Sequence, residues 1–169
     1  MPRLRPQPRR RVRPSKPDVT DESACKRVAL DLLARREHSR QELTRKLAAR
    51  EFPEPMVAGI LDELERTGAL AESRFTESFV RARVAKGQGP ARIRAELAQR
   101  GVAEDEVDRA LREADVDWMA TIRAVRRKRF GAEVPRDYRE RARQARFLEY
   151  RGFDSARIRA ALELDADSD

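Results

Sequence analysis

The chain has 169 residues, of which 40% are apolar and 40% are charged, and its formal net charge is +8 at neutral pH. This charged share is well above the usual quarter, so it favours a thin array of small units over one thick globular core. The single cysteine cannot form an intrachain disulfide, and no apolar run approaches the roughly 20 residues that span a membrane, so we expect a soluble, cytoplasmic protein with no membrane partner.

The two ends of the chain carry opposite charges. Residues 1–17 hold seven Arg and Lys among five prolines and no acid, whereas the last five residues hold three aspartates. Such compositions cannot bury enough apolar area to fold, so we expect a disordered basic tail over 1–20 and an acidic C-terminal end over 165–169. The basic tail either contacts nucleic acid or another acidic surface, or it only aids solubility.

One six-residue pattern occurs three times along the chain, at 47–52, 97–102 and 148–153, and each copy begins with Leu-x-x-Arg. Apolar residues after each copy also stay in register, first Val57, Val107 and Ile158, then Leu61, Leu111 and Leu162. A fixed period indicates tandem copies of one supersecondary unit, here a helix, a short break and a second helix. The alternative is that these are ordinary helical hairpins, which resemble one another because all are amphipathic.

Repeat 1 covers 21–70. Its first helix is expected over 22–36, with Val28 and Leu32 on the apolar face. Ser39 and Glu42 have the spacing of a capping box, which predicts the start of a second helix. Pro53 prevents that helix from continuing and sets the start of a third.

Repeat 2 covers 71–115. Phe75 and Phe79 mark the apolar face of its first helix, and Pro90 is expected at the first position of its second helix, where the missing N–H costs nothing. Gly101 suits the position with positive φ that follows a helix end.

Repeat 3 covers 116–164. Trp118 opens its first helix, Pro135 is expected to start the second, and Tyr138, Phe147 and Leu148 are candidate core residues. Asp154 is expected to cap the last helix. No segment shows strand periodicity, so the predicted fold is all-α, with nine helices in three tandem three-helix, helix-turn-helix-like repeats that form an elongated, curved array.

The sequence does not indicate a catalytic site, because no set of reactive side chains is expected to converge. His38 is the only histidine and lies in a polar turn, so we expect it on the surface, and Cys25 has no obvious partner. One Cys and one His cannot hold a structural zinc ion. The glycines at 87 and 89 join two helices and do not follow a strand, which excludes the usual phosphate-binding loops. We therefore predict a protein that is not an enzyme and needs no cofactor or metal.

Clusters of basic residues remain, around the glycine turn of repeat 2 and along the first two helices of repeat 3. Cations near helix C-termini also stabilise the helix dipole, by about 0.3–1 kcal/mol each, but that accounts for one or two per helix and not for the density at 126–129. We expect these clusters to meet a polyanion or an acidic protein surface. The candidate binding residues are Arg81, Arg83, Lys86, Arg92, Arg94, Arg123, Arg126, Arg127, Lys128, Arg129, Arg136, Arg139 and Arg143. The recurring Arg50, Arg100 and Arg151 are interpreted only as helix-end cations.

Segments 68–75, 79–83, 86–87, 93–97 and 100–102, together with 147–153, resemble the signature motifs of the bacterial RecX family. The resemblance covers about 24–163. It departs from the family pattern at Ala71, where an acid is common, and at Thr76, where alanine is common.

This resemblance implies tandem three-helix repeats and a regulator of the RecA recombinase that acts as a monomer. It implies binding in the groove of the RecA–DNA filament and inhibition of strand exchange, ATP turnover and the co-protease activity that triggers the SOS response. Single- or double-stranded DNA would be contacted weakly or through RecA. The alternatives are a direct DNA-binding protein of helix-turn-helix type and a helical adaptor for another protein. The acids at 104–106 would repel phosphates, so repeat 3 is the better DNA-binding candidate.

Overall fold

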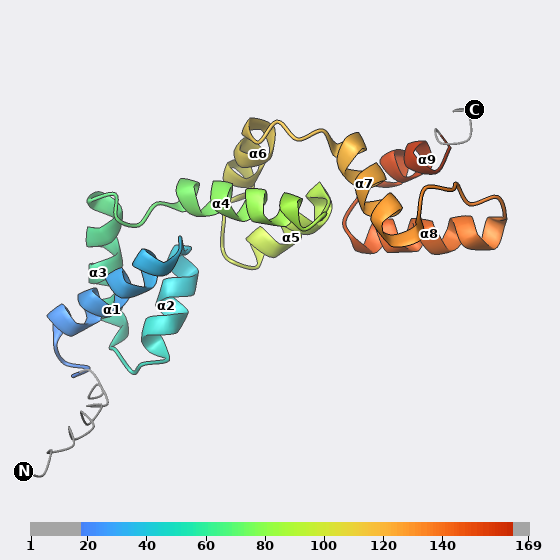
Figure 1. The fold of residues 1–169 in the computed structure, drawn as a ribbon. Coiled ribbons are helices and arrows are strands. Elements are labelled where there is room, and N and C mark those ends of the chain that lie inside the picture. The colour runs from blue at the N-terminus through green and yellow to red at the C-terminus, as the bar shows by residue number, and fades with distance from the viewer. Residues whose placement is uncertain (1–17, 164–169) are drawn as a thin grey trace, which may run out of the picture.

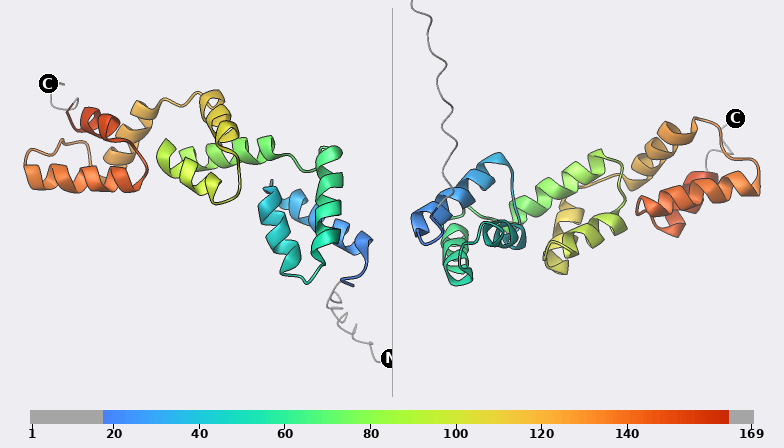
Figure 2. Two further views of the ribbon diagram at one scale, coloured as in Figure 1. Left: turned by 180° about the vertical axis from the view of Figure 1, so that it is seen from behind. Right: turned by 90° about the horizontal axis from the view of Figure 1, so that it is seen from below.

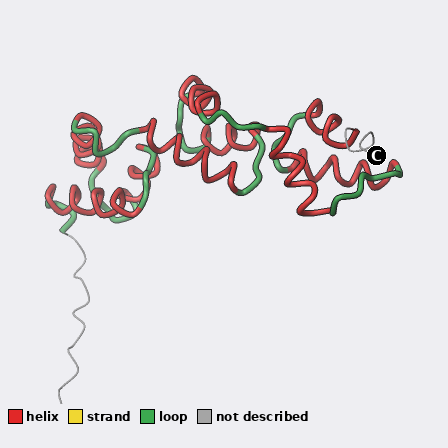
Figure 3. The backbone as a smooth tube through the Cα atoms, turned by 45° about the horizontal axis from the view of Figure 1, so that its top comes forward, coloured by secondary structure: helices red, strands yellow, loops and turns green. Residues whose placement is uncertain are grey.

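The computed structural model describes residues 18–163, so the predicted basic tail up to residue 17 and the acidic end at 165–169 lie outside the described residues. Within 18–163 the chain forms nine helices and no strand, which confirms the all-α prediction (Figures 1 and 3). The helices are α1 (Glu22–Arg35), α2 (Arg40–Ala48), α3 (Glu54–Arg66), α4 (Glu72–Ala85), α5 (Pro90–Ala98), α6 (Glu104–Glu113), α7 (Trp118–Phe130), α8 (Tyr138–Tyr150) and α9 (Ser155–Glu163).

The helices are grouped in threes, and the groups follow one another along an extended molecule (Figures 1 and 2). Helices α1–α3, α4–α6 and α7–α9 each pack mainly among themselves and enclose a separate apolar core. The half-buried Trp118 packs against both the second and the third core. This is the tandem three-helix architecture expected from the sequence.

Acidic and hydroxyl side chains start several of the helices. The Ser39 hydroxyl accepts from the Glu42 amide at 3.1 Å, as predicted, and Asp154 accepts from the Arg157 amide at 2.9 Å. Helix α8 begins three residues later than Pro135 suggested, with Asp137 as its N-cap. These side chains satisfy amide groups that a helix leaves without an internal partner.

Tyr138 corrects a prediction, because this candidate core residue is 87% exposed. At 3.6 residues per turn it lies about 80° around α8 from Leu148, which points into the third core. Leu148 itself is fully buried, as are its counterparts Leu47 and Leu97.

The repeated six-residue pattern forms the same turn in each repeat. Glu51, Gly101 and Gly152 have φ of 68°, 77° and 93°, so each occupies the left-handed region after a helix. The amide directly after each of these residues donates to the carbonyl of Leu47, Leu97 or Leu148, at 3.4, 3.2 and 3.2 Å. These are Schellman turns, which explains the preference for glycine and for an apolar residue directly after it.

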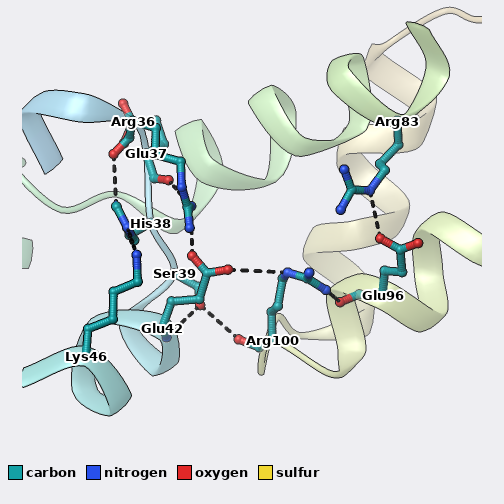
Figure 4. Close-up of polar contacts among 9 residues, drawn as sticks. All are labelled: Arg36, Glu37, His38, Ser39, Glu42, Lys46, Arg83, Glu96 and Arg100. Atoms are coloured by element: carbon teal, nitrogen blue, oxygen red, sulfur yellow. Dashed lines mark hydrogen bonds and ion pairs between the residues drawn. The ribbon is translucent and has the colours of Figure 1, made fainter. Parts of the chain in front are cut away.

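Adjacent repeats dock by one shared rule: the start of the second helix in one repeat meets the Schellman turn of the next. Between repeats 1 and 2, the buried Ser39 hydroxyl donates to the Arg100 carbonyl at 3.0 Å while it caps α2 (Figure 4). The Glu42 carboxylate pairs with Arg36 and with Arg100, at 2.8 and 3.3 Å.

Between repeats 2 and 3 the same elements meet through backbone groups. The Gly89 amide donates to the Arg151 carbonyl at 2.8 Å, and the Ala91 amide donates to the Gly152 carbonyl at 3.1 Å. A Cβ atom at Gly89 would overlap the Gly152 carbonyl, and one at Gly152 would overlap Arg92. The junction therefore requires glycine on both sides.

Candidate functional site

Positive charge is concentrated in one of the three repeats. Segment 116–163 carries 13 Lys and Arg against 7 Asp and Glu, whereas 21–70 carries 9 against 10 and 71–115 carries 9 against 9. An excess of this size on one end of an elongated molecule attracts anionic partners. Repeat 3 therefore carries the largest excess of cations among the three repeats.

The predicted cluster around the glycine turn of repeat 2 is partly neutralised. Arg83 and Arg92 both bind the Glu96 carboxylate, at 2.7 and 3.1 Å, and Arg94 binds Asp108 at 2.7 Å. Burial by itself would raise the pKa of Glu96, but the hydrogen bonds from the two arginines outweigh it and hold that pKa below its ordinary value. These three arginines share two carboxylates, so they retain one net positive charge.

Arg81 and Lys86 differ from their neighbours in that cluster. Both are exposed, and neither forms an ion pair with another described residue. Lys86 is the C-cap of α4, so it lies at the junction with repeat 3.

Arg126 corrects the predicted site, because only 1% of its surface is exposed. Its Nη1 donates to the Glu133 carbonyl at 2.9 Å and its Nη2 donates to the Ala132 carbonyl at 3.1 Å. Arg126 therefore fastens the α7–α8 loop and does not face a partner. Its position one turn after the buried Ile122 was the signal that sequence reasoning missed.

The remaining predicted cations of repeat 3 are mostly directed outward. Exposed residues without an ion pair to another described residue are Arg127, Lys128, Arg129, Arg136 and Arg139. Arg143 is exposed but pairs with Glu140 at 2.8 Å, and Arg123 is half buried. The sequence clusters thus reduce to a cationic surface at the end of α7 and the start of α8.

A groove at the junction of repeats 2 and 3 joins part of both predicted clusters. It has a volume of about 810 Å³ and lies between the end of α4, the second half of α7 and the end of α8. Lys86, Lys128 and Arg129 border it, together with Arg151. We refer to it as the junction groove.

Arg151 is a residue whose part in this site the sequence interpretation missed. Its Nη1 donates to the Lys86 carbonyl at 2.9 Å, and its guanidinium lies 5.2 Å from the centre of the Phe147 ring. A cation that is held in place across the junction is pre-organised for an anion. Arg151 and Arg50 occupy equivalent positions in the repeated pattern, but Arg50 donates to the Lys46 carbonyl of its own helix. The contact with Lys86, which only the three-dimensional structure shows, distinguishes Arg151 from it.

His38 also differs from its predicted surface position, since only 1% of it is exposed. One ring nitrogen lies 3.0 Å from the Arg36 carbonyl and the other lies 2.8 Å from the Lys46 ammonium (Figure 4). Burial lowers the pKa of His38, and the positive charges of Arg36 and Lys46 lower it further. The neutral ring fits this setting as a structural group of repeat 1.

Among residues 18–163, no group of three or more His, Cys, Asp and Glu is arranged to hold a metal ion. Cys25 is fully buried, and burial raises the pKa of its thiol. None of the helices in this range is long and apolar enough to cross a membrane.

The fold and the surface together define a class: a tandem three-helix repeat protein with a cationic last repeat. The matching family descriptions are "RecX, first three-helix domain" for residues 25–64, the second such domain for 72–111 and the third for 115–162. The chain belongs to the RecX family of regulatory proteins.

Individual relatives agree with this assignment. The chain is 54% identical over 138 residues to the "Regulatory protein RecX" of Halorhodospira halophila, covering 82% of this chain and 86% of that one. It is 50% identical over 135 residues to that of Pseudomonas entomophila, covering 80% and 87%. The crystal structure of RecX from Lactobacillus salivarius has the same fold, with a TM-score of 0.72 at 20% identity over 88% of this chain and 99% of that one.

Proposed function

We propose that this protein is a non-catalytic modulator, mainly an inhibitor, of the RecA recombinase. It acts as a cytoplasmic monomer that binds in the groove of the RecA–DNA filament and suppresses strand exchange, ATP turnover and SOS co-protease activity. The observation that carries this proposal is the set of uncompensated cations on the last repeat of a RecX-family chain.

The shape and charge of the molecule support this mode of action. The repeats follow one another along an extended molecule, and such a shape offers a long surface to a polymer (Figure 2). Cations at the end of α7 and the start of α8 attract the phosphates or acidic side chains that a protein–DNA filament presents. Inhibition further requires tighter binding to one filament state than to another, because equal affinity for both states shifts nothing.

The test is a titration of the protein into RecA on single-stranded DNA, with ATP turnover and strand exchange as readouts. The informative variant reverses three exposed cations of repeat 3: Arg127→Glu, Lys128→Glu and Arg129→Glu. It leaves the buried Arg126 unchanged, so that the α7–α8 loop is preserved. Charge repulsion across the interface should weaken inhibition at least about tenfold.

A matched control makes the same change of net charge in repeat 1: Arg27→Glu, Arg45→Glu and Arg66→Glu. These cations are also exposed and form no ion pair with another described residue. The control should inhibit nearly as well as the original chain. Absence of inhibition by the original chain, or equal loss in both variants, would contradict the proposal.

Direct DNA binding is a second candidate, and the charge of repeat 3 is the observation that favours it. A DNA-binding protein loses affinity as salt rises, with a logarithmic slope of about −0.9 for each phosphate that it neutralises on duplex DNA. Salt-dependent binding to bare DNA that equals binding to the RecA-coated strand would favour this alternative.

A further inference from the structure

We propose that the junction groove binds an acidic peptide segment of a partner protein, with an apolar side chain of that segment seated on the groove floor. The inference deepens the proposed function, because it names the partner chemistry that one part of the cationic surface recognises. Its test requires no RecA, so the two proposals can fail separately.

The groove is built from elements that the junction holds in place. The Gly89 amide and the Arg151 carbonyl join the two repeats at 2.8 Å, and Gly87 packs so closely on Val125 that a Cβ there would overlap that side chain. Arg151 adds a hydrogen bond across the groove to the Lys86 carbonyl at 2.9 Å. A site formed in advance loses little conformational entropy when a segment binds.

The charge around the groove favours an anionic segment. Lys86, Lys128, Arg129 and Arg151 line it, and none of them forms an ion pair with another described residue. The C-terminal ends of α4 and α8 also point here, and each contributes a partial charge of about −0.5. Four full positive charges exceed that contribution, so the groove remains positive.

The floor of the groove distinguishes a peptide from a nucleic acid. We use this term for the uncharged lining, which is mostly aliphatic and consists of Val84, Ala85, Gly87, Thr121, Ala124, Val125 and Phe147. The Phe147 ring is already in contact with Arg151 and with Phe130, whose ring centre lies 5.2 Å away. Single-stranded nucleic acids rely on open aromatic faces on which bases stack, and this floor offers none.

An acidic peptide with one apolar side chain matches both parts of the groove. Its carboxylates would pair with the four cations, and a leucine-sized side chain would be removed from water on the aliphatic floor. A volume of about 810 Å³ accommodates a short segment and not a folded domain.

The experiment measures binding of fluorescein-labelled peptides to the full chain by fluorescence anisotropy. The probe has four Asp or Glu residues around one leucine, and two comparison peptides replace the leucine by serine or the acids by Asn and Gln. Both replacements should weaken binding at least about fivefold, because charge and the apolar anchor each contribute. A labelled oligothymidylate is the nucleic-acid comparison.

Two double charge reversals locate the site. Lys128→Glu combined with Arg129→Glu should weaken peptide binding at least about tenfold. The matched control, Arg45→Glu combined with Arg66→Glu, makes the same change of net charge at exposed cations of repeat 1 that do not line the groove, and should weaken binding less than about twofold. Ala124→Glu places an acid on the floor without removing any cation, and should also abolish binding.

Each result decides the proposal. Selective loss in the groove variants, with a requirement for the leucine, supports it. Equal loss in the control variant, no detectable peptide binding, or tighter binding of oligothymidylate than of the peptide would overturn it. Circular dichroism of each variant checks that the helices are retained, and a variant that loses helicity is replaced by Lys128→Gln with Arg129→Gln, for which a smaller selective loss is required.

Discussion

Repeats 1 and 3 share one fold but use their charged residues differently. In repeat 1, cations join helices: Lys26 of α1 binds Glu63 of α3 at 2.7 Å, and Arg40 of α2 binds Asp62 and Glu65 of α3. In repeat 3, Arg143 and Arg157 pair with acids three residues before them, and many other cations face outward. Apolar positions and the Schellman turns therefore specify the fold. The charged positions can differ between repeats, so that they join helices in repeat 1 and face outward in repeat 3.

The largest effect is expected at Arg126, the cation of repeat 3 that does not follow this pattern. Arg126→Ala removes the donors to the Ala132 and Glu133 carbonyls and should lower the free energy of unfolding by about 2–4 kcal/mol. Urea denaturation followed by circular dichroism measures this change. Arg129→Ala, an exposed cation of the same helix, is the control and should change stability by less than about 0.5 kcal/mol. Equal effects would show that Arg126 is not the structural residue of this helix.

The two junctions provide the next comparison. Gly152→Ala places a methyl group against Arg92 and should destabilise the contact of repeats 2 and 3 by more than the about 1–2 kcal/mol that a left-handed backbone costs alone. At Gly101 the new atom would meet the flexible Gln41 side chain at 3.3 Å, so Gly101→Ala should cost only the backbone part. Hydrogen exchange of the amides of Gly89 and Ala91 reports the junction directly. An equal loss of stability in both variants would contradict the described close approach.

A smaller difference in the free energy of unfolding is expected between a cation that forms ion pairs and one that does not. Arg40→Ala should lower the free energy of unfolding by about 0.2–1 kcal/mol, as is usual for exposed ion pairs. Arg139→Ala should leave stability unchanged or raise it slightly, because Arg139 has no ion pair with a described residue and lies in a region of excess positive charge. Thermal denaturation at low and high salt checks both, and the Arg40 effect should shrink at high salt.

The smallest effect is a pH dependence that belongs to repeat 1. The folded-state pKa of His38 lies below its ordinary value of 6.5, so the unfolded chain binds a proton more readily. The contribution of His38 is therefore fully present above pH 6.5 and is lost as pH falls from 6.5 through the folded-state pKa. Unfolding free energies at about pH 5.5 and about pH 7.5 measure it. The slope should be smaller in His38→Gln, and an unchanged slope would assign it to other groups.

The fold was predictable because its main determinants are local. Leucines at 47, 97 and 148, the turn residues after them and the N-caps at Ser39 and Asp154 are readable as short patterns. Burial of charged and polar side chains was not readable in this way. Arg126 is buried where it donates to carbonyls of the α7–α8 loop, and Arg83 pairs with Glu96, 13 residues away. His38 is buried between the Arg36 carbonyl and the Lys46 ammonium, so its polar partners are close in sequence but do not form a recognisable pattern.

The site was predictable only as a region. Sequence clusters identified the cations at the end of α7, but not that Lys128 and Arg129 share one groove with Lys86. That arrangement depends on how two repeats dock, which is set by contacts between Gly89 and Arg151. Ion pairs between residues far apart in the sequence determine which cations remain unpaired. The sequence alone therefore does not define the charged surface.

The docking rule between repeats gives the molecule a direction. Each Schellman turn of repeats 2 and 3 receives the helix start of the preceding repeat, whereas the turn of repeat 1 carries Glu51 in the left-handed position that glycine occupies in the other two. A repeat engineered onto the N-terminal side would dock at this turn, so Glu51→Gly is the change that would give it the same surface as the turns at Gly101 and Gly152.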